Sequence, residues 1–119
     1  MKLKEIEIHN FKSIENLKIE IDDFLVIIGE NNTGKSSILK GLELFYSESI
    51  KNINEEIFYF KDTNKPIEII LTFDKLSEEE KEQKYIKHWI FNDEVKIKRV
   101  VIIDSSSNKP KSIFYGWQQ

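Results

Sequence analysis

The stretch that decides the fold is Gly29-Glu30-Asn31-Asn32-Thr33-Gly34-Lys35-Ser36, which matches the phosphate-loop pattern G-x-x-x-x-G-K-[ST]. Its two glycines let the backbone turn tightly and approach a ligand, so that consecutive N–H groups can point at phosphate oxygens. Lys35 is then expected to reach the β and γ phosphates of a nucleoside triphosphate, and Ser36 to bind the Mg²⁺ that bridges them. A helix that begins here turns the positive end of its dipole toward the anion.

The residues on both sides of this loop have the pattern that a working phosphate loop requires, a buried strand before it and a helix after it. Residues 24–28 are an unbroken apolar run, typical of a strand that is covered on both faces. After the loop, a helix is predicted from about Lys35 to Tyr46. Its apolar side is predicted to consist of Ile38, Leu39, Leu42, Phe45 and Tyr46. A chance match to the loop pattern is therefore the weaker interpretation.

Length and composition indicate a single folded domain. The chain has 119 residues, which is small for a complete nucleotide-hydrolysing enzyme, since each βαβ unit takes about 30 residues or more. No run approaches the ~18 apolar residues of a membrane span, so no membrane association is expected. The absence of cysteine excludes disulfides and favours a cytoplasmic location. A net charge of −3 provides no general attraction to nucleic acid.

Alternating apolar and polar residues predict strands elsewhere in the chain. The predicted strands cover residues 4–9, 17–21, 67–73, 95–103 and 112–115, with a turn around residues 12–13. A capping box formed by Ser77 and Glu80 predicts a surface helix to about Trp89, and residues 47–63 are predicted to be irregular or partly helical. We therefore expect an α/β fold, a P-loop NTPase with a flanking antiparallel β layer.

Two motifs in a fixed order carry a family resemblance. The first is Ile6-Glu7-Ile8-His9-Asn10-Phe11-Lys12-Ser13-Ile14, and after a second alternating strand comes the loop motif, residues 28–37. This order resembles the amino-terminal start of the ABC-class ATPase heads of SMC, RecF and OLD-nuclease type, and Gly-Glu-Asn-Asn most resembles OLD-family nucleases. The resemblance is specific over residues 1–45. It implies a head that binds ATP, dimerises around it and works on DNA, accompanied in OLD proteins by a metal-dependent Toprim nuclease domain.

By this resemblance, residues 29–37, Ser37 included, hold the triphosphate and Mg²⁺, and Lys12 lies near the nucleotide. Lys12 can equally be an ordinary solvated turn lysine. The chain contains no Leu-Ser-Gly-Gly signature, no Toprim acidic cluster and no apolar strand that ends in Asp followed by Glu. Residues 1–119 are therefore interpreted as the amino-terminal portion of an AAA/ABC-type head, with the remainder absent. We assign no catalytic residue, and we expect ATP binding without turnover.

Other candidate sites are weaker. Asp104 ends an apolar run and could hold Mg²⁺ through water, but Ser105 follows it, which favours a turn at the end of a strand. Asp74 has the same form. Residues 64–67 and 108–111 begin with Asn-Lys but lack the Asp that recognises guanine, so ATP is favoured over GTP.

The two histidines and a short basic segment complete the candidates. His9 and His88 lack the spacing of metal ligands and are interpreted as structural or exposed. Lys96, Lys98 and Arg99 could contact DNA phosphates, although a solvated strand face is favoured.

Three functions remain open at this point. The leading hypothesis is the ATP-binding portion of an OLD/RecF/SMC-like ATPase, whose complete form would be an ATPase or ATP-dependent endonuclease in DNA repair or defence. The second is a self-contained small P-loop kinase, which would need Asp104 or Asp74 and a lid rich in arginine. Arg99 is the only arginine, which counts against it. The third is a remnant that binds nucleotide without catalysis.

Overall fold

A computed structural model describes residues 2–21, 33–84 and 87–116, and of residues 33–35 it describes the backbone alone. The predicted strand at residues 24–28 and the loop residues 29–32 lie outside this part of the chain. The helix that follows them, α2, spans Thr33–Tyr46, close to the range predicted from the sequence.

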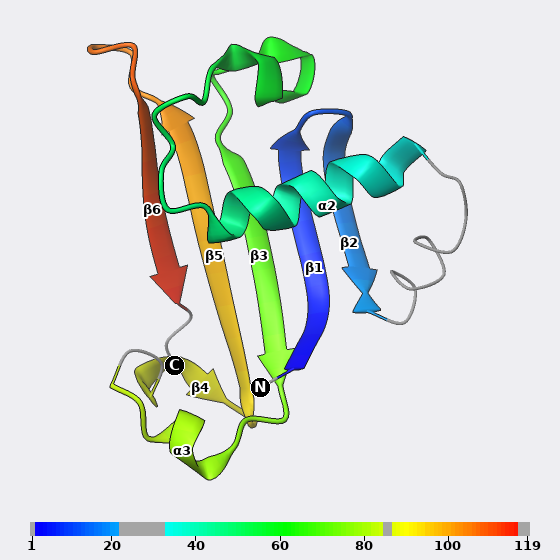
Figure 1. The fold of residues 1–119 in the computed structure, drawn as a ribbon, viewed down its shortest axis with the longest axis vertical. Helices are drawn as coiled ribbons and strands as arrows, with labels where there is room; N and C mark the ends of the chain where they lie inside the picture. Colours follow the sequence, from blue (N-terminus) through cyan, green and yellow to red (C-terminus); the bar gives the residue numbers. More distant parts are fainter. Residues whose placement is uncertain (1, 22–32, 85–86, 117–119) are drawn as a thin grey trace.

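Within the described residues, six strands form one antiparallel sheet (Figure 1). The strands are β1 Lys2–Phe11, β2 Ile14–Glu20, β3 Ile67–Asp74, β4 Ile90–Phe91, β5 Glu94–Ile103 and β6 Pro110–Gly116. Their order is β2-β1-β3-β5-β4, and β6 also pairs with β5. The alternating segments are therefore confirmed as strands, and β5 and β6 form the hairpin that the sequence predicts. The parallel part of the predicted α/β fold has no counterpart among the described residues.

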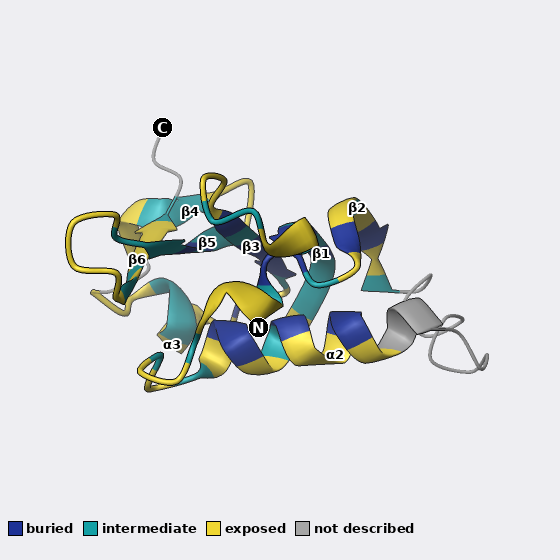
Figure 2. Ribbon diagram, turned by 90° about the horizontal axis from the view of Figure 1, so that it is seen from above, coloured by how far each residue is buried: buried dark blue, intermediate teal, exposed yellow. Residues whose placement is uncertain are grey.

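Helix α2 lies across one face of the sheet and supplies the other half of the core (Figures 1 and 2). Its buried stripe consists of Ser37, Ile38, Gly41, Leu44 and Phe45. The sheet contributes the fully buried side chains of Ile6, Ile8, Ile67, Ile69, Leu71 and Val101. This close packing leaves little room for a side chain at position 41, because a Cβ there would lie 2.9 Å from Cδ1 of Ile8.

The predicted apolar side of the helix is wrong at two positions. Leu39 is 38% exposed and Tyr46 is 62% exposed, whereas Leu44 is buried. The reason is that the buried stripe is centred on Gly41, where the helix backbone packs against Ile8 of β1. Residues three and four positions before or after Gly41 lie on the same face of the helix as Gly41, which faces the sheet. Leu39 and Tyr46 are not at these positions.

The surface helix that was predicted to reach Trp89 is also too long. Its capping box is present, with Ser77 accepting a hydrogen bond from the Glu80 N–H and Glu80 accepting one from the Ser77 N–H. However, α3 spans only Glu78–Lys81, and a 3-10 turn covers Lys87–Trp89. None of the residues of α3 is buried, so no apolar face supports further turns.

Between α2 and β3, the chain forms two 3-10 turns, Glu55–Ile57 and Tyr59–Lys61, as expected for a partly helical segment. Among the described helices, none is long and apolar enough to cross a membrane.

Candidate functional site

The predicted phosphate-binding residues divide between the described and the undescribed parts of the chain. Gly29, Glu30, Asn31 and Asn32 lie outside the described residues, and Thr33, Gly34 and Lys35 are described as backbone in the first turn of α2. The next two serines differ in burial, since Ser36 is exposed and Ser37 is buried. Of these two serines, Ser36 is therefore the one whose hydroxyl is accessible to a ligand.

A side-chain contact joins the start of α2 to the turn between β1 and β2. The hydroxyl of Ser13 lies 3.0 Å from the hydroxyl of Ser37. The two motifs that carry the family resemblance, far apart in the sequence, therefore meet in the structure.

The turn that contains Ser13 is held in an unusual backbone conformation. Asn10 and Lys12 have φ angles of 59° and 51°, which residues other than glycine adopt only at a cost. The buried side chain of Asn10 donates hydrogen bonds to the carbonyl of Lys65 at 2.7 Å and to that of Asp62 at 3.3 Å. The Lys12 N–H donates to the carbonyl of Ile57 at 2.7 Å. These contacts fix the shape of the turn before any ligand binds.

Lys12 lies beside α2, but further along the helix than its first turn. Its Nζ lies 5.9 Å from the centre of the Phe11 ring. Lys12 also lines a surface hollow of about 260 Å³ together with Lys40 and Glu43. These two residues are four and seven positions beyond Ser36, which corresponds to about 6 and 10 Å along a helix. The Lys12 side chain would have to swing toward the helix start to contact a phosphate.

The carboxyl end of α2 is capped by Arg99, which was predicted to lie with Lys96 and Lys98 on a solvated strand face. Arg99 is only 4% exposed. Its Nη1 donates to the carbonyls of Leu44 at 2.6 Å, Phe45 at 3.2 Å and Ser47 at 2.7 Å. Burial lowers the pKa of Arg99 from its ordinary value, yet an arginine remains charged at neutral pH.

The proposed basic segment is therefore not one surface. Successive side chains of a strand point to opposite faces, so Lys96 and Lys98 lie on the face away from α2 while Arg99 points toward it. Lys98 forms an ion pair with Glu68 at 3.1 Å. The sequence did contain a signal for the position of Arg99, because it alternates in register with the apolar residues Ile97 and Val101.

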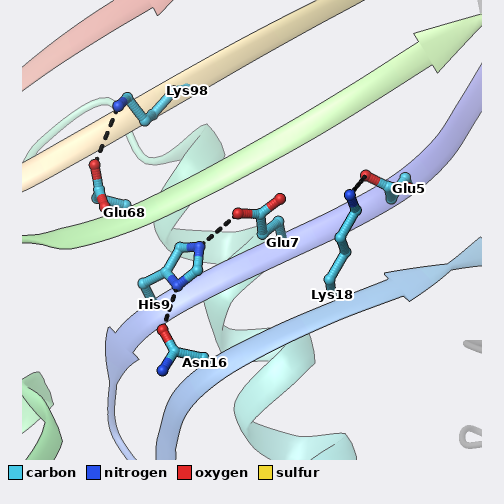
Figure 3. Close-up of polar contacts among 7 residues, drawn as sticks. All are labelled: Glu5, Glu7, His9, Asn16, Lys18, Glu68 and Lys98. Carbon is cyan, nitrogen blue, oxygen red and sulfur yellow. Dashed lines mark hydrogen bonds and ion pairs between the residues drawn. The ribbon is translucent and has the colours of Figure 1, made fainter.

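The face of the sheet away from α2 carries paired polar side chains (Figure 3). His9 bridges two strands, with Nδ1 2.6 Å from Oδ1 of Asn16 and Nε2 2.6 Å from Oε2 of Glu7. Burial lowers the pKa of His9, but the hydrogen bonds to Glu7 and Asn16 outweigh this effect and leave the pKa raised. These contacts support the structural interpretation of this histidine.

Asp104 lies in the turn between β5 and β6. Its Oδ1 accepts hydrogen bonds from the N–H of Ser106 at 2.9 Å and from its hydroxyl at 2.8 Å, and Oδ2 pairs with Lys111. The Lys111 ammonium and the Ser106 donors hold the pKa of Asp104 well below its usual range. Figure 1 shows this turn at the sheet edge opposite to the one where α2 begins. The contacts favour a turn residue over a metal ligand, and within the described residues no group of three acidic or histidine side chains could hold a metal.

Comparisons with known proteins agree with the motifs. The sequence profile of the family described as AAA ATPase domain matches residues 1–115. Endonuclease GajA of Bacillus cereus (strain VD045) is 39% identical over 85 residues, which cover 70% of this chain and 14% of that protein. OLD nuclease of Thermus scotoductus (strain ATCC 700910 / SA-01) is 30% identical over 77 residues, covering 60% of this chain and 14% of that protein. DNA replication and repair protein RecF of Rickettsia canadensis (strain McKiel) is 38% identical over 45 residues, or 37% of this chain and 12% of that protein.

The chain thus spans about a seventh or less of the length of these relatives. The predicted resemblance to the ATPase heads of OLD and RecF type is confirmed. This chain belongs to the AAA ATPase domain family, within the P-loop NTPases.

Proposed function

We propose that this chain is the ATP-binding, amino-terminal portion of an ATPase head that acts in DNA processing. The observation that carries the proposal is the position of the phosphate-loop motif, which runs directly into α2, a helix packed on the sheet and tied to the Asn10–Ser13 turn. In this proposal, residues 1–119 form one domain of an α/β head of ABC type. Further strands and the signature motif of the head come from outside these residues.

The chemistry proposed for the loop follows from its residue types. Backbone N–H groups of residues 29–36 surround the triphosphate, and the amino end of α2 adds its positive dipole. Lys35 neutralises charge on the β and γ phosphates. Ser36 is proposed as the Mg²⁺ ligand, since its side chain is exposed whereas that of Ser37 is directed to Ser13. The metal would neutralise phosphate charge.

Lys12 is proposed as a second cation near the nucleotide. The Ser13–Ser37 contact supports this role, because it holds the neighbouring Lys12 against the helix that follows the loop. A lysine side chain is flexible enough to move from the Phe11 ring toward the amino end of α2.

The relatives supply the proposed biological setting. Two of them are named as an endonuclease and a nuclease, and a third as a DNA replication and repair protein. By analogy, the complete head would form a homodimer around ATP, in the cytoplasm, and couple nucleotide binding to work on DNA.

A self-contained kinase is not favoured. It would need its one arginine in a lid over the phosphates, but Arg99 is buried beneath the carboxyl end of α2. Its candidate metal residue Asp104 is held by Lys111 and Ser106.

Titration with a fluorescent ATP analogue in the presence of Mg²⁺ tests the proposal. Lys35→Ala should abolish measurable binding, since a charge-assisted contact contributes roughly 1.5–3 kcal/mol. Lys40→Ala, which removes an exposed lysine from the same helix, is the matched control and should bind like the wild type. Equal affinities of the wild type and Lys35→Ala would overturn the assignment.

A further inference from the structure

At the carboxyl end of α2, the Arg99 side chain binds carbonyls of the chain and also contacts β6. Phe45 of the helix packs against Phe114 of the same strand, with ring centres 5.7 Å apart. Besides its three carbonyl acceptors, Arg99 donates from Nε to the hydroxyl of Ser112 at 2.7 Å. The centre of its guanidinium lies 4.8 Å from the Phe114 ring. Both of these residues belong to β6, so Arg99 on β5 joins the last turn of the helix to the β5–β6 hairpin.

Only a guanidinium can make these contacts together. The last four carbonyls of a helix lack partners within it, and a buried carbonyl without a donor is costly. Arginine presents five N–H donors in one rigid plane, so one edge can reach the carbonyls while Nε reaches a hydroxyl. Its positive charge also complements the negative end of the helix dipole.

The middle of the helix is in close contact with the sheet, and this contact is taken as the pivot for a tilt of the helix. At Gly41 the helix backbone approaches Ile8 so closely that a Cβ would lie 2.9 Å from Cδ1 of Ile8. From Gly41, Tyr46 lies about 7.5 Å along the axis and Thr33 about 12 Å in the other direction. If the helix tilts as a rigid rod about Gly41, a displacement of 1 Å at the carboxyl end becomes about 1.6 Å at the amino end.

The amino end is where such a displacement matters. A binding site must hold its donors within about 0.5 Å of the productive geometry to keep its affinity. The Ser13–Ser37 contact is one hydrogen bond between two short side chains, and it resists tilting less than four donor–acceptor contacts of a buried cation do.

We propose that Arg99 is a positioning residue for the nucleotide site. By fixing the last turn of α2 on the β5–β6 hairpin, it sets where the first turn presents its N–H groups to the phosphates. This inference rests on the proposed function, since it concerns the ligand of the same helix.

The test compares two variants that both remove buried interactions from β5. Arg99→Met removes the donors, and Val101→Ala removes fully buried apolar volume from the same face of the same strand without touching α2 carbonyls. Melting temperatures are measured for both, and binding of a fluorescent ATP analogue is then measured well below either. We expect Arg99→Met to weaken binding about fivefold or more, and Val101→Ala to weaken it by less than about twofold.

Arg99→Lys is the second variant, for the case in which Arg99→Met fails to fold. A lysine keeps the charge but cannot reach the carbonyls and Ser112 in one plane, so a loss of at least about twofold is expected. Affinity unchanged in Arg99→Lys, or equally reduced in Arg99→Met and Val101→Ala, would overturn the positioning role. Failure of the proposed function is distinguishable, because in that case the wild type and Lys35→Ala would bind the analogue equally.

Discussion

The hydroxyl groups of Ser13 and Ser37 lie 3.0 Å apart and join the turn after β1 to the helix after the phosphate loop. This contact ties a turn with positive φ at Asn10 and Lys12 to the helix proposed to begin the nucleotide site. A substitution in the turn is therefore expected to affect the helix, and a substitution in the helix to affect the turn.

Ser13→Ala should lower the free energy of unfolding by about 0.5–1.5 kcal/mol, because the buried Ser37 hydroxyl loses its partner. Urea denaturation measures this effect. Ser107→Ala, in the exposed turn after β5, is the matched control and should change stability by less than about 0.5 kcal/mol. Equal values for the two variants would show that the contact does not contribute.

Gly41→Ala should be less destabilising when residue 8 is valine than when it is isoleucine. The added methyl group meets Cδ1 of Ile8, which is the atom that Ile8→Val removes. A double-mutant cycle measured by chemical denaturation should give a coupling free energy of at least about 0.5 kcal/mol. Additive effects would mean that the helix shifts away from β1, so that the added methyl group no longer meets Ile8.

Stability should fall as the pH rises above 6.5 and through the raised pKa of His9. Its pKa in the folded protein is raised above 6.5, so protonation stabilises the fold. The stabilisation is complete below the unfolded pKa and is lost as the pH rises through the folded pKa. The urea midpoint should show this decline in the wild type and in His88→Gln, whereas His9→Gln should flatten it. A decline of the same size in His9→Gln would assign the effect to another group.

Asp104→Asn should change the affinity for the Mg²⁺ complex of ATP by less than about twofold. The carboxylate is held in its turn by Ser106 and Lys111, at the sheet edge away from the start of α2. Binding is measured with and without Mg²⁺. A large loss confined to the Mg²⁺ titration would restore the small-kinase hypothesis.

The chain alone should not turn over ATP, even under conditions in which it binds ATP. Catalysis requires contacts that strengthen in the transition state, and a phosphate loop by itself supplies uniform binding. Phosphate release measured over a range of protein concentrations is the test. A turnover number near 1 s⁻¹ that disappears in Lys35→Ala would contradict this expectation.

Local patterns in the sequence were sufficient for most of the described fold. The alternation of apolar residues is a direct consequence of strand geometry, so it located β1, β3 and β5, and the capping box located the start of α3. The length of α3 could not be obtained in this way, because whether further turns form depends on burial against another element.

The contacts that shape the candidate site were much harder to predict. Asn10 and Arg99 have partners more than fifty residues away in the sequence, and nothing local indicates which carbonyls will lack donors. Likewise, the inward side of α2 depends on the close approach at Gly41, a tertiary contact. The loop motif was recognisable because the chemistry of phosphate binding constrains neighbouring residues.

The pairing of β1 with β3 has a consequence for how the protein folds. His9 lies opposite Glu68 and Lys2 opposite Asp74, so joining these strands closes a loop of about sixty residues. The β1–β2 and β5–β6 hairpins need no such closure and can form early. Helix α2 contacts both β1 and β3, so we expect it to dock only after these two strands have paired. The phosphate loop is carried within the loop that closes, which makes competence to bind nucleotide a late event in folding and a sensitive reporter of its completion.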